Sequence, residues 1–114
     1  MLKVYGLGRC VFVDNGKDFN IAKNVKIIEW LKTEILDSIA GLFKGLQKGS
    51  EQVFVDFLAN IIVLTYVLGR RLGLSFRELD QEVLNQIAQN KESGHQLEEW
   101  FGDLSALQQH IDKR

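Results

Sequence analysis

Apolar residues recur at intervals of three and four along most of the chain, which is the period of an amphipathic α-helix. In the first such stretch, Asp18 or Asn20 can serve as the N-cap and Gly49 suits the C-terminal end. The pattern therefore predicts a helix over about residues 20–48. Its apolar positions are Ile27, Ile28, Leu31, Ile35, Ile39, Leu42 and Leu46.

The next stretch, residues 51–72, is apolar around almost the whole circumference of a helix, with Ser50 as the N-cap and Gly73 after its end. A helix that is apolar on every side is normally covered on every side. One chain of 114 residues does not readily cover it. We therefore expect the bundle to be completed by self-association, as a homodimer or homotetramer.

The same stretch raises the question of a membrane span. Asp56 and Asn60 interrupt its apolar run, and only residues 61–69 remain before Arg70. A spanning helix needs about 20 predominantly apolar residues. The sequence therefore predicts a buried helix of a soluble protein, with no membrane partner.

Two further helices are expected, over residues 76–92 and 95–112. Ser75 and Glu78 have the spacing of a capping box, and Gly102 interrupts the last stretch so that Asp103 can cap a short final helix. These patterns indicate an all-α bundle of about four helices over residues 20–114.

Residues 1–19 differ from the rest of the chain. Two short β-branched and aromatic runs are separated by Gly6-Leu7-Gly8 and closed by Asp14-Asn15-Gly16. This pattern is typical of a β-hairpin or an extended arm. An isolated hairpin is only marginally stable, so we expect it to pack on the helices or on a second subunit.

Composition narrows the functional classes. The net charge is −1, so the protein has no basic field that would attract nucleic acid or an anionic membrane. A single cysteine, Cys10, cannot form an internal disulfide, and the N-terminus lacks the pattern of a secretory signal. We expect a cytoplasmic location and a Cys10 that packs as a small apolar residue.

Four oxygen-bearing side chains on the first two helices are the candidates for chemistry. Glu34 and Asp37 are neighbours on one helix surface, beside its apolar face, and Asp56 and Asn60 share a strip of the next helix. A divalent cation between the helices would relieve the repulsion between the carboxylates. The alternatives are a solvated face for Glu34 and Asp37, and for Asp56 an ion pair with Arg70, Arg71 or a lysine.

The segment TEILDSIAGLFKGLQKGSEQVFVDFLANIIVLTYVLGRRLGLS resembles the core of the MazG-like nucleoside-triphosphate pyrophosphohydrolases. That family carries an acidic pair on one helix and a second acidic pair on the next. Glu34 and Asp37 match the first pair, whereas Phe57 stands where the third carboxylate belongs and Asn60 matches the final Asp. Asp56 lies one residue too early. The resemblance covers about residues 25–76, and the tail GHQLEEWFGDLSALQQHI is similar to a subfamily of short bacterial proteins.

The resemblance implies an all-α, oligomeric enzyme that uses Mg²⁺ to hydrolyse nucleoside triphosphates to monophosphate and pyrophosphate. Its ligands would be Glu34 and Asp37, which also serve as the catalytic carboxylates, with help from Asp56 and Asn60. The side chains expected to contact the nucleotide are Trp30, Lys44, Lys48 and Arg71, although a tryptophan beside an apolar stripe is more often part of a core.

The altered second motif leaves a different function open. Without the third carboxylate, the protein could be a catalytically degenerate relative that binds or senses nucleotides, or serves as an oligomeric structural module. Position 57 separates the two hypotheses, because Phe57 favours the degenerate relative whereas Glu34 and Asp37 favour the enzyme.

Overall fold

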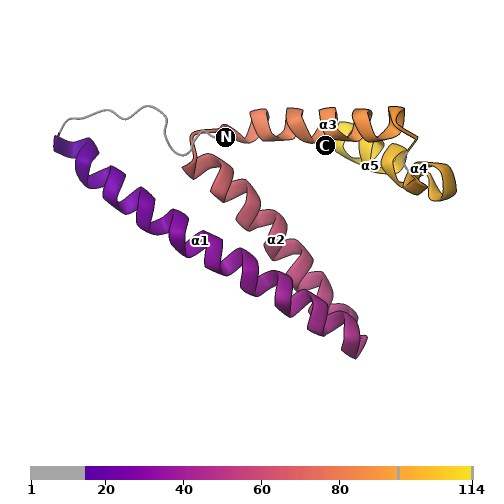
Figure 1. Ribbon diagram of the computed structural model, residues 1–114, viewed down its shortest axis with the longest axis horizontal. Coiled ribbons are helices and arrows are strands. Elements are labelled where there is room, and N and C mark those ends of the chain that lie inside the picture. The colour runs from indigo at the N-terminus through magenta and orange to yellow at the C-terminus, as the bar shows by residue number, and fades with distance from the viewer. Residues whose placement is uncertain (1–14, 95, 114) are drawn as a thin grey trace. The chain divides into compact units, whose positions relative to one another are not determined.

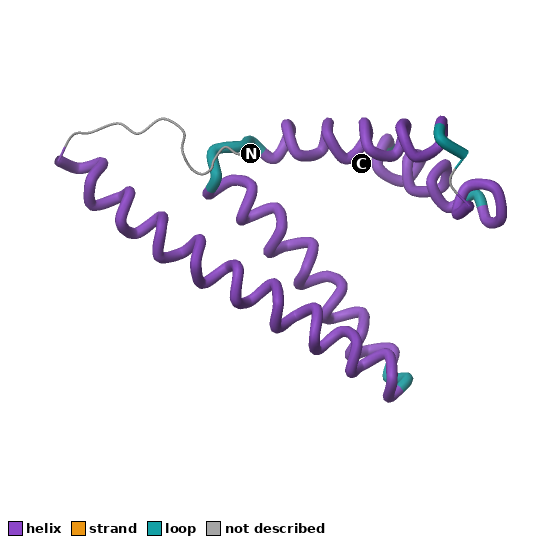
Figure 2. The backbone as a smooth tube through the Cα atoms, viewed as in Figure 1, coloured by secondary structure: helices purple, strands orange, loops and turns teal. Residues whose placement is uncertain are grey.

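The computed structural model describes residues 15–94 and 96–113, with side-chain detail from residue 21 onward. Every regular element in those ranges is an α-helix (Figures 1 and 2), so the predicted all-α class is confirmed. The helices are α1 (Asn15–Lys48), α2 (Glu51–Arg71), α3 (Phe76–Glu92), α4 (Gln96–Phe101) and α5 (Asp103–Asp112).

The helices form two compact units. In the first, within residues 1–75, α2 packs antiparallel against the C-terminal part of the longer α1 (Figure 1). In the second, within residues 76–114, α5 packs on both α3 and α4. The candidate chemistry lies in the first unit.

Helix α1 begins at Asn15, earlier than the start near Asp18 or Asn20 that the sequence predicted. Residues 15–19 are therefore helical, and the prediction of a β-hairpin is wrong for them. The reason is that extending an existing helix adds one hydrogen bond for each residue that becomes ordered, whereas an isolated β-hairpin is only marginally stable in water. The rest of the predicted hairpin, residues 1–14, lies outside the described residues.

The connection between α1 and α2 is as short as predicted. Gly49 has φ of 70°, in the left-handed region that favours glycine, and its N–H donates to the carbonyl of Gly45 at 3.0 Å. Ser50 then adopts an extended conformation as the N-cap of α2, although its side chain makes no capping hydrogen bond. A turn this tight makes the two helices antiparallel neighbours.

Small residues allow α2 to approach α1 closely. Leu31, Ser38 and Gly45 are buried and lie seven residues apart, which defines the seam of α1 that faces α2. A Cβ added to Gly45 would lie 2.9 Å from Val53 Cγ1, and one added to Gly41 would overlap the ring of Phe57. The two glycines thus help to set the register in which α2 lies along α1.

We predict that Gly41→Ala destabilises the hairpin. Alanine gains about 1 kcal/mol over glycine in a helix, but overpacking against the Phe57 ring costs about 1–3 kcal/mol, so a net loss of up to about 2 kcal/mol is expected in urea unfolding. In a Phe57→Ala background the ring is absent, and the same substitution should become stabilising. If Gly41→Ala still lowered the free energy of unfolding in the Phe57→Ala background, the close contact between Gly41 and the Phe57 ring would be contradicted.

Helix α2 is largely exposed in a single chain. Only Leu64 and Gly69 are buried, whereas Leu58, Ile62 and Val63 are 46%, 57% and 56% exposed. One chain therefore leaves most of this helix uncovered, as the sequence indicated, because a single neighbouring helix covers only one strip of its surface. Its coverage by a second subunit stays a prediction.

Among the described residues, α2 is also the helix whose length and composition would allow it to cross a membrane. Its length and mean hydropathy suffice for a span even though it contains Asp56 and Asn60. A single helix of this kind is weak evidence for a membrane span, because the core helix of a soluble protein passes the same test.

In the second unit, Ile87 of α3 is buried, and Lys91 donates to Oε1 of Gln108 on α5 at 3.0 Å. The cap of α5 differs from the prediction. Gly102 occupies the N-cap position, and Glu98 of α4 accepts hydrogen bonds from the backbone N–H and the hydroxyl of Ser105. Asp103 is therefore inside the helix, and a carboxylate from the preceding helix satisfies the free N–H.

This cap predicts an acid-sensitive second unit. The hydroxyl and N–H of Ser105 hold the pKa of Glu98 below its ordinary value of 4.5. A carboxyl whose pKa is lower in the folded state stabilises that state above pH 4.5, and the stabilisation disappears as the pH falls through the folded-state value. Glu98→Gln should lower the melting temperature at pH 7. It should also reduce the change in melting temperature with pH between pH 5 and 3. Glu99→Gln, on the same helix, should leave the pH dependence of the melting temperature unchanged.

Candidate functional site

The candidate residues of α1 lie along one edge of the helix, beside the seam that packs on α2. Glu34 is half-buried and lies four residues before the buried Ser38, so it borders the interface, whereas Asp37 is exposed. Successive residues of this edge are separated by alternating steps of four and three, which keeps them on one strip. The strip comprises Ile27, Trp30, Glu34, Asp37, Gly41, Lys44 and Lys48.

Asn60 of α2 reaches across to this part of α1. Its Nδ2 donates to Ser38 Oγ at 2.8 Å, and Ser38 is only 4% exposed. Because Ser38 is one turn from Glu34 and adjacent to Asp37, the structure brings Asn60 to the same level of the hairpin as the acidic pair. Of the two candidate residues of α2, Asn60 is the one that bonds to α1 here, through Ser38.

Phe57 occupies the position at which the resemblance places the third carboxylate. Its ring packs directly over Gly41, one turn beyond Asp37 on the same edge of α1. The position therefore faces the candidate site, but it presents an apolar ring in place of a metal ligand.

Asp56 is placed differently from the other three candidates. Its side chain is exposed, and Oδ1 accepts a hydrogen bond from Nε2 of Gln52 at 2.9 Å. The premise that this carboxylate is buried is wrong, because α2 is uncovered on that side. Its partner in the structure is the amide of Gln52, one turn earlier. The sequence had offered an ion pair with Arg70, Arg71 or a lysine as the alternative to a metal.

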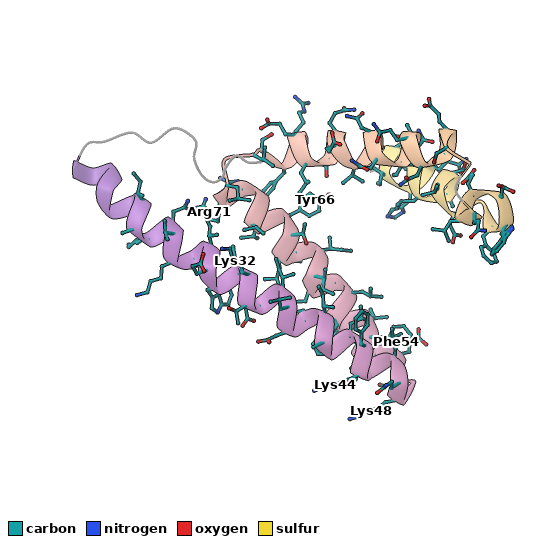
Figure 3. The ribbon with its side chains drawn as sticks, in the orientation of Figure 1. Lys32, Lys44, Lys48, Phe54, Tyr66 and Arg71 are labelled. Atoms are coloured by element: carbon teal, nitrogen blue, oxygen red, sulfur yellow. The ribbon has the colours of Figure 1, made fainter. Side chains whose placement is uncertain are left out.

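The basic candidates lie at opposite ends of the hairpin. Lys44 and Lys48 extend from the C-terminal part of α1 (Figure 3), about 10 and 16 Å along the helix axis from Asp37. Arg71 lies at the other end, where its carbonyl accepts from Asn24 Nδ2 at 2.9 Å and its Nη1 donates to Asn24 Oδ1 at 3.4 Å. These bonds tie the end of α2 to α1, which indicates a structural role for Arg71.

Trp30 is 53% exposed and lies one turn before Glu34 on the same edge. An aromatic ring in this position is accessible to a ligand and is not part of the core of the hairpin. Of the predicted nucleotide contacts, Trp30, Lys44 and Lys48 share the edge of the acidic pair, and Arg71 does not.

The chemistry of the donors on this edge suits a hard cation. No cluster of three or more His, Cys, Asp or Glu side chains occurs within the described part of the chain. Mg²⁺, however, is typically held by one or two carboxylates together with substrate phosphates and water. Glu34, Asp37 and the side-chain oxygen of Asn60 fit that pattern, with the remaining ligands left to the substrate.

Ser38 is the site residue that the sequence reasoning missed. The available signal was its position in the seam, seven residues from Leu31 and seven from Gly45, where a polar side chain needs a partner across the interface. Nothing in the spacing of the acidic residues indicates that this partner is Asn60.

Comparison with known proteins supports the resemblance stated for the sequence. A family model described as the MazG-like family matches residues 21–104, which includes most of α1, all of α2 and most of the second unit. No curated protein and no solved structure has significant similarity to the chain. Since the matched segment covers well over half of the sequence, the chain belongs to the MazG-like family.

Proposed function

We propose that this protein is a Mg²⁺-dependent nucleoside-triphosphate pyrophosphohydrolase, which releases pyrophosphate and a nucleoside monophosphate. The family to which it belongs supports a fold of the nucleotide-pyrophosphohydrolase type. The observation that carries the proposal is the pairing of Glu34 and Asp37 on an accessible edge of α1 with Asn60 brought to the same level from α2.

The roles follow from the positions of the side chains. Glu34, Asp37 and Asn60 would hold Mg²⁺, which supplies neutralisation of the triphosphate charge and activation of the attacking water. Lys44 and Lys48 follow on the same edge and would offer their ammonium groups to phosphate oxygens. Trp30 offers an exposed ring on which a base can stack.

A second candidate function is nucleotide binding without hydrolysis. It is favoured by one observation, the packing of the Phe57 ring over Gly41 at the position of the third carboxylate. A site with two carboxylates can still bind a Mg²⁺–nucleotide complex through the phosphates, but it has fewer groups to orient the water.

A pyrophosphate-release assay against the common nucleoside triphosphates, with and without Mg²⁺, tests the first function. Mg²⁺-dependent release that is lost in Glu34→Gln supports hydrolysis. Tight binding of a triphosphate with no release at any Mg²⁺ concentration would establish the second function in its place.

We also propose that the protein is a homodimer or a larger homo-oligomer, formed through the side of the hairpin that faces away from the acidic edge. Phe43 follows Glu34 by nine residues, which places it about 180° around α1. On this side Leu36 and Phe43 are 68% and 61% exposed. Apolar patches of this kind mark protein interfaces, and a second hairpin would complete a four-helix bundle.

This interface predicts a change of mass in one variant. The wild-type protein should have at least twice the 13.0 kDa mass of one chain in light scattering. Phe43→Glu should be monomeric and still helical by circular dichroism, because a charge cannot be buried unpaired in an apolar interface. Lys44→Glu, one residue further and about 100° around the helix, on the edge that carries Glu34 and Asp37, should retain the wild-type mass. A monomeric wild-type protein would refute the interface.

A further inference from the structure

The register of the hairpin carries an inference about the base of the bound nucleotide. The contacts that define this register join Gly45 to Val53, Gly41 to Phe57 and Ser38 to Asn60. Each step back along α1 is matched by an equal step forward along α2, as antiparallel helices require. A further step of seven residues places Val67 of α2 beside the buried Leu31, the neighbour of Trp30.

Two valines of α2 continue the strip that carries Asn60. Val63 and Val67 follow it by three and seven residues, which keeps them on one surface of the helix. Val63 is 56% exposed and Val67 is half-buried. At neighbouring levels, the acidic edge of α1 carries the exposed apolar residues Ile27 and Trp30. Apolar side chains of both helices therefore extend the site away from the turn of the hairpin.

We propose that Val63 and Val67 form, together with Trp30, the surface that holds the base of the nucleotide, and that this surface selects the base by its area and not by its hydrogen-bonding pattern. Trp30 would stack on the flat face of the base, and the two valines would contact its rim and the sugar. The inference rests on the proposed function, because it needs a triphosphate held at Glu34 and Asp37.

The order of residues along the edge sets the direction of the nucleotide. Trp30 precedes Glu34 by about 6 Å along the helix axis, and Lys44 follows Asp37 by about 10 Å. A nucleoside triphosphate is largely apolar at the base and anionic at the other end. The apolar end of the edge therefore suits the base, and the end that carries the lysines suits the phosphates.

A surface of this composition distinguishes the bases weakly. Valine side chains have no hydrogen-bond donor or acceptor, and both ends of the nearby Asn24 amide are bonded to Arg71. Sites that hydrogen-bond a substrate group reject analogues lacking it by about 10⁴-fold or more, whereas apolar pockets discriminate by about 10- to 200-fold. We therefore expect the four common bases to bind within about ten-fold of one another, with purines tighter because they stack over a larger area.

The fluorescence of Trp30 provides the first test. Trp100→Phe leaves Trp30 as the single tryptophan of the full-length protein. With Mg²⁺ present, non-hydrolysable α,β-methylene analogues of the four common ribonucleoside triphosphates should quench this fluorescence. Inorganic tripolyphosphate, which has no base, should bind without quenching and about five-fold or more weaker than the analogues.

The second test compares two identical substitutions on α2. Val63→Ala should weaken binding of the analogues about three- to ten-fold, because it removes two methyl groups from the contact, and should leave binding of tripolyphosphate unchanged. Val55→Ala is the matched control, since Val55 is 45% exposed and lies off the strip of Asn60. This control should bind every probe as the wild-type protein does.

The outcomes separate the inference from the proposed function. If neither the analogues nor tripolyphosphate bind in the presence of Mg²⁺, the proposed function fails. If both bind equally well and Trp30 is not quenched, the phosphate site stands and the base surface is refuted. A preference for one base above about 200-fold would overturn selection by area. Equal losses in Val63→Ala and Val55→Ala would overturn the role of Val63.

Discussion

Replacing Glu34 with Gln is expected to lower Mg²⁺-dependent pyrophosphate release by at least about 100-fold, with little change in stability. The substitution preserves the shape of the side chain but removes one of the two carboxylates at the proposed site. Groups that merely orient a metal ligand already contribute 10- to 100-fold, so the loss of a charged ligand is expected to cost at least the upper value. Initial rates over a range of Mg²⁺ concentrations measure the effect.

Glu29→Gln is the matched control for this experiment. Glu29 is on the same helix, but it is exposed and pairs with Lys32 at 2.7 Å, away from the edge that carries Glu34. Since an exposed ion pair contributes at most about 1 kcal/mol to stability, this variant should be as active as wild type. Equal losses of activity in both variants would show that the site lies elsewhere.

Phe57→Glu is expected to increase Mg²⁺ affinity at least about ten-fold while making the metal-free protein less stable. The new carboxylate would replace the ring that now lies over Gly41, one turn from Asp37. Loss of a large aromatic side chain costs up to about 3–5 kcal/mol, and a third carboxylate adds repulsion in the absence of metal. Bound Mg²⁺ should recover part of that stability, because a ligand that binds only the folded state stabilises it.

The measurement is the melting temperature with and without Mg²⁺, combined with calorimetric titration. Phe57→Gln is the control, since it removes the same ring and has a similar shape without the charge. A rise in melting temperature with Mg²⁺ that is larger in Phe57→Glu than in Phe57→Gln would support the assignment of position 57. Equal responses would mean that this position does not face the metal.

Much of the secondary structure could be predicted because it depends on local patterns. The helices after Gly49 begin and end close to the expected residues, since glycines and the apolar period mark their ends. The two local errors have a common cause. In both cases another interaction outweighs the capping residue that is nearest in the sequence. At Asn15 it is the extension of an existing helix, and in α5 it is the hydrogen bond from Ser105 to the carboxylate of Glu98 on another helix.

The candidate site could be predicted only on one of its two helices. The period of α1 was enough to place Glu34 and Asp37 on one edge, and the resemblance identified Phe57 and Asn60 as the positions opposite. Whether these positions meet α1, and through which atoms, depends on the register of two helices. That register is set where Gly41 and Gly45 receive the side chains of Phe57 and Val53.

By itself the sequence determined the all-α class, the two helices on either side of Gly49-Ser50 and the acidic edge of α1, because helix periodicity and helix-ending glycines are local properties. Only the tertiary structure decided that Asn60 is bonded to Ser38, that Phe57 covers Gly41, and that Asp56 is exposed. The physical reason is that contacts between helices depend on how closely and in which register the helices pack. The small residues of α1 allow close packing, but the register depends on the side chains of both helices.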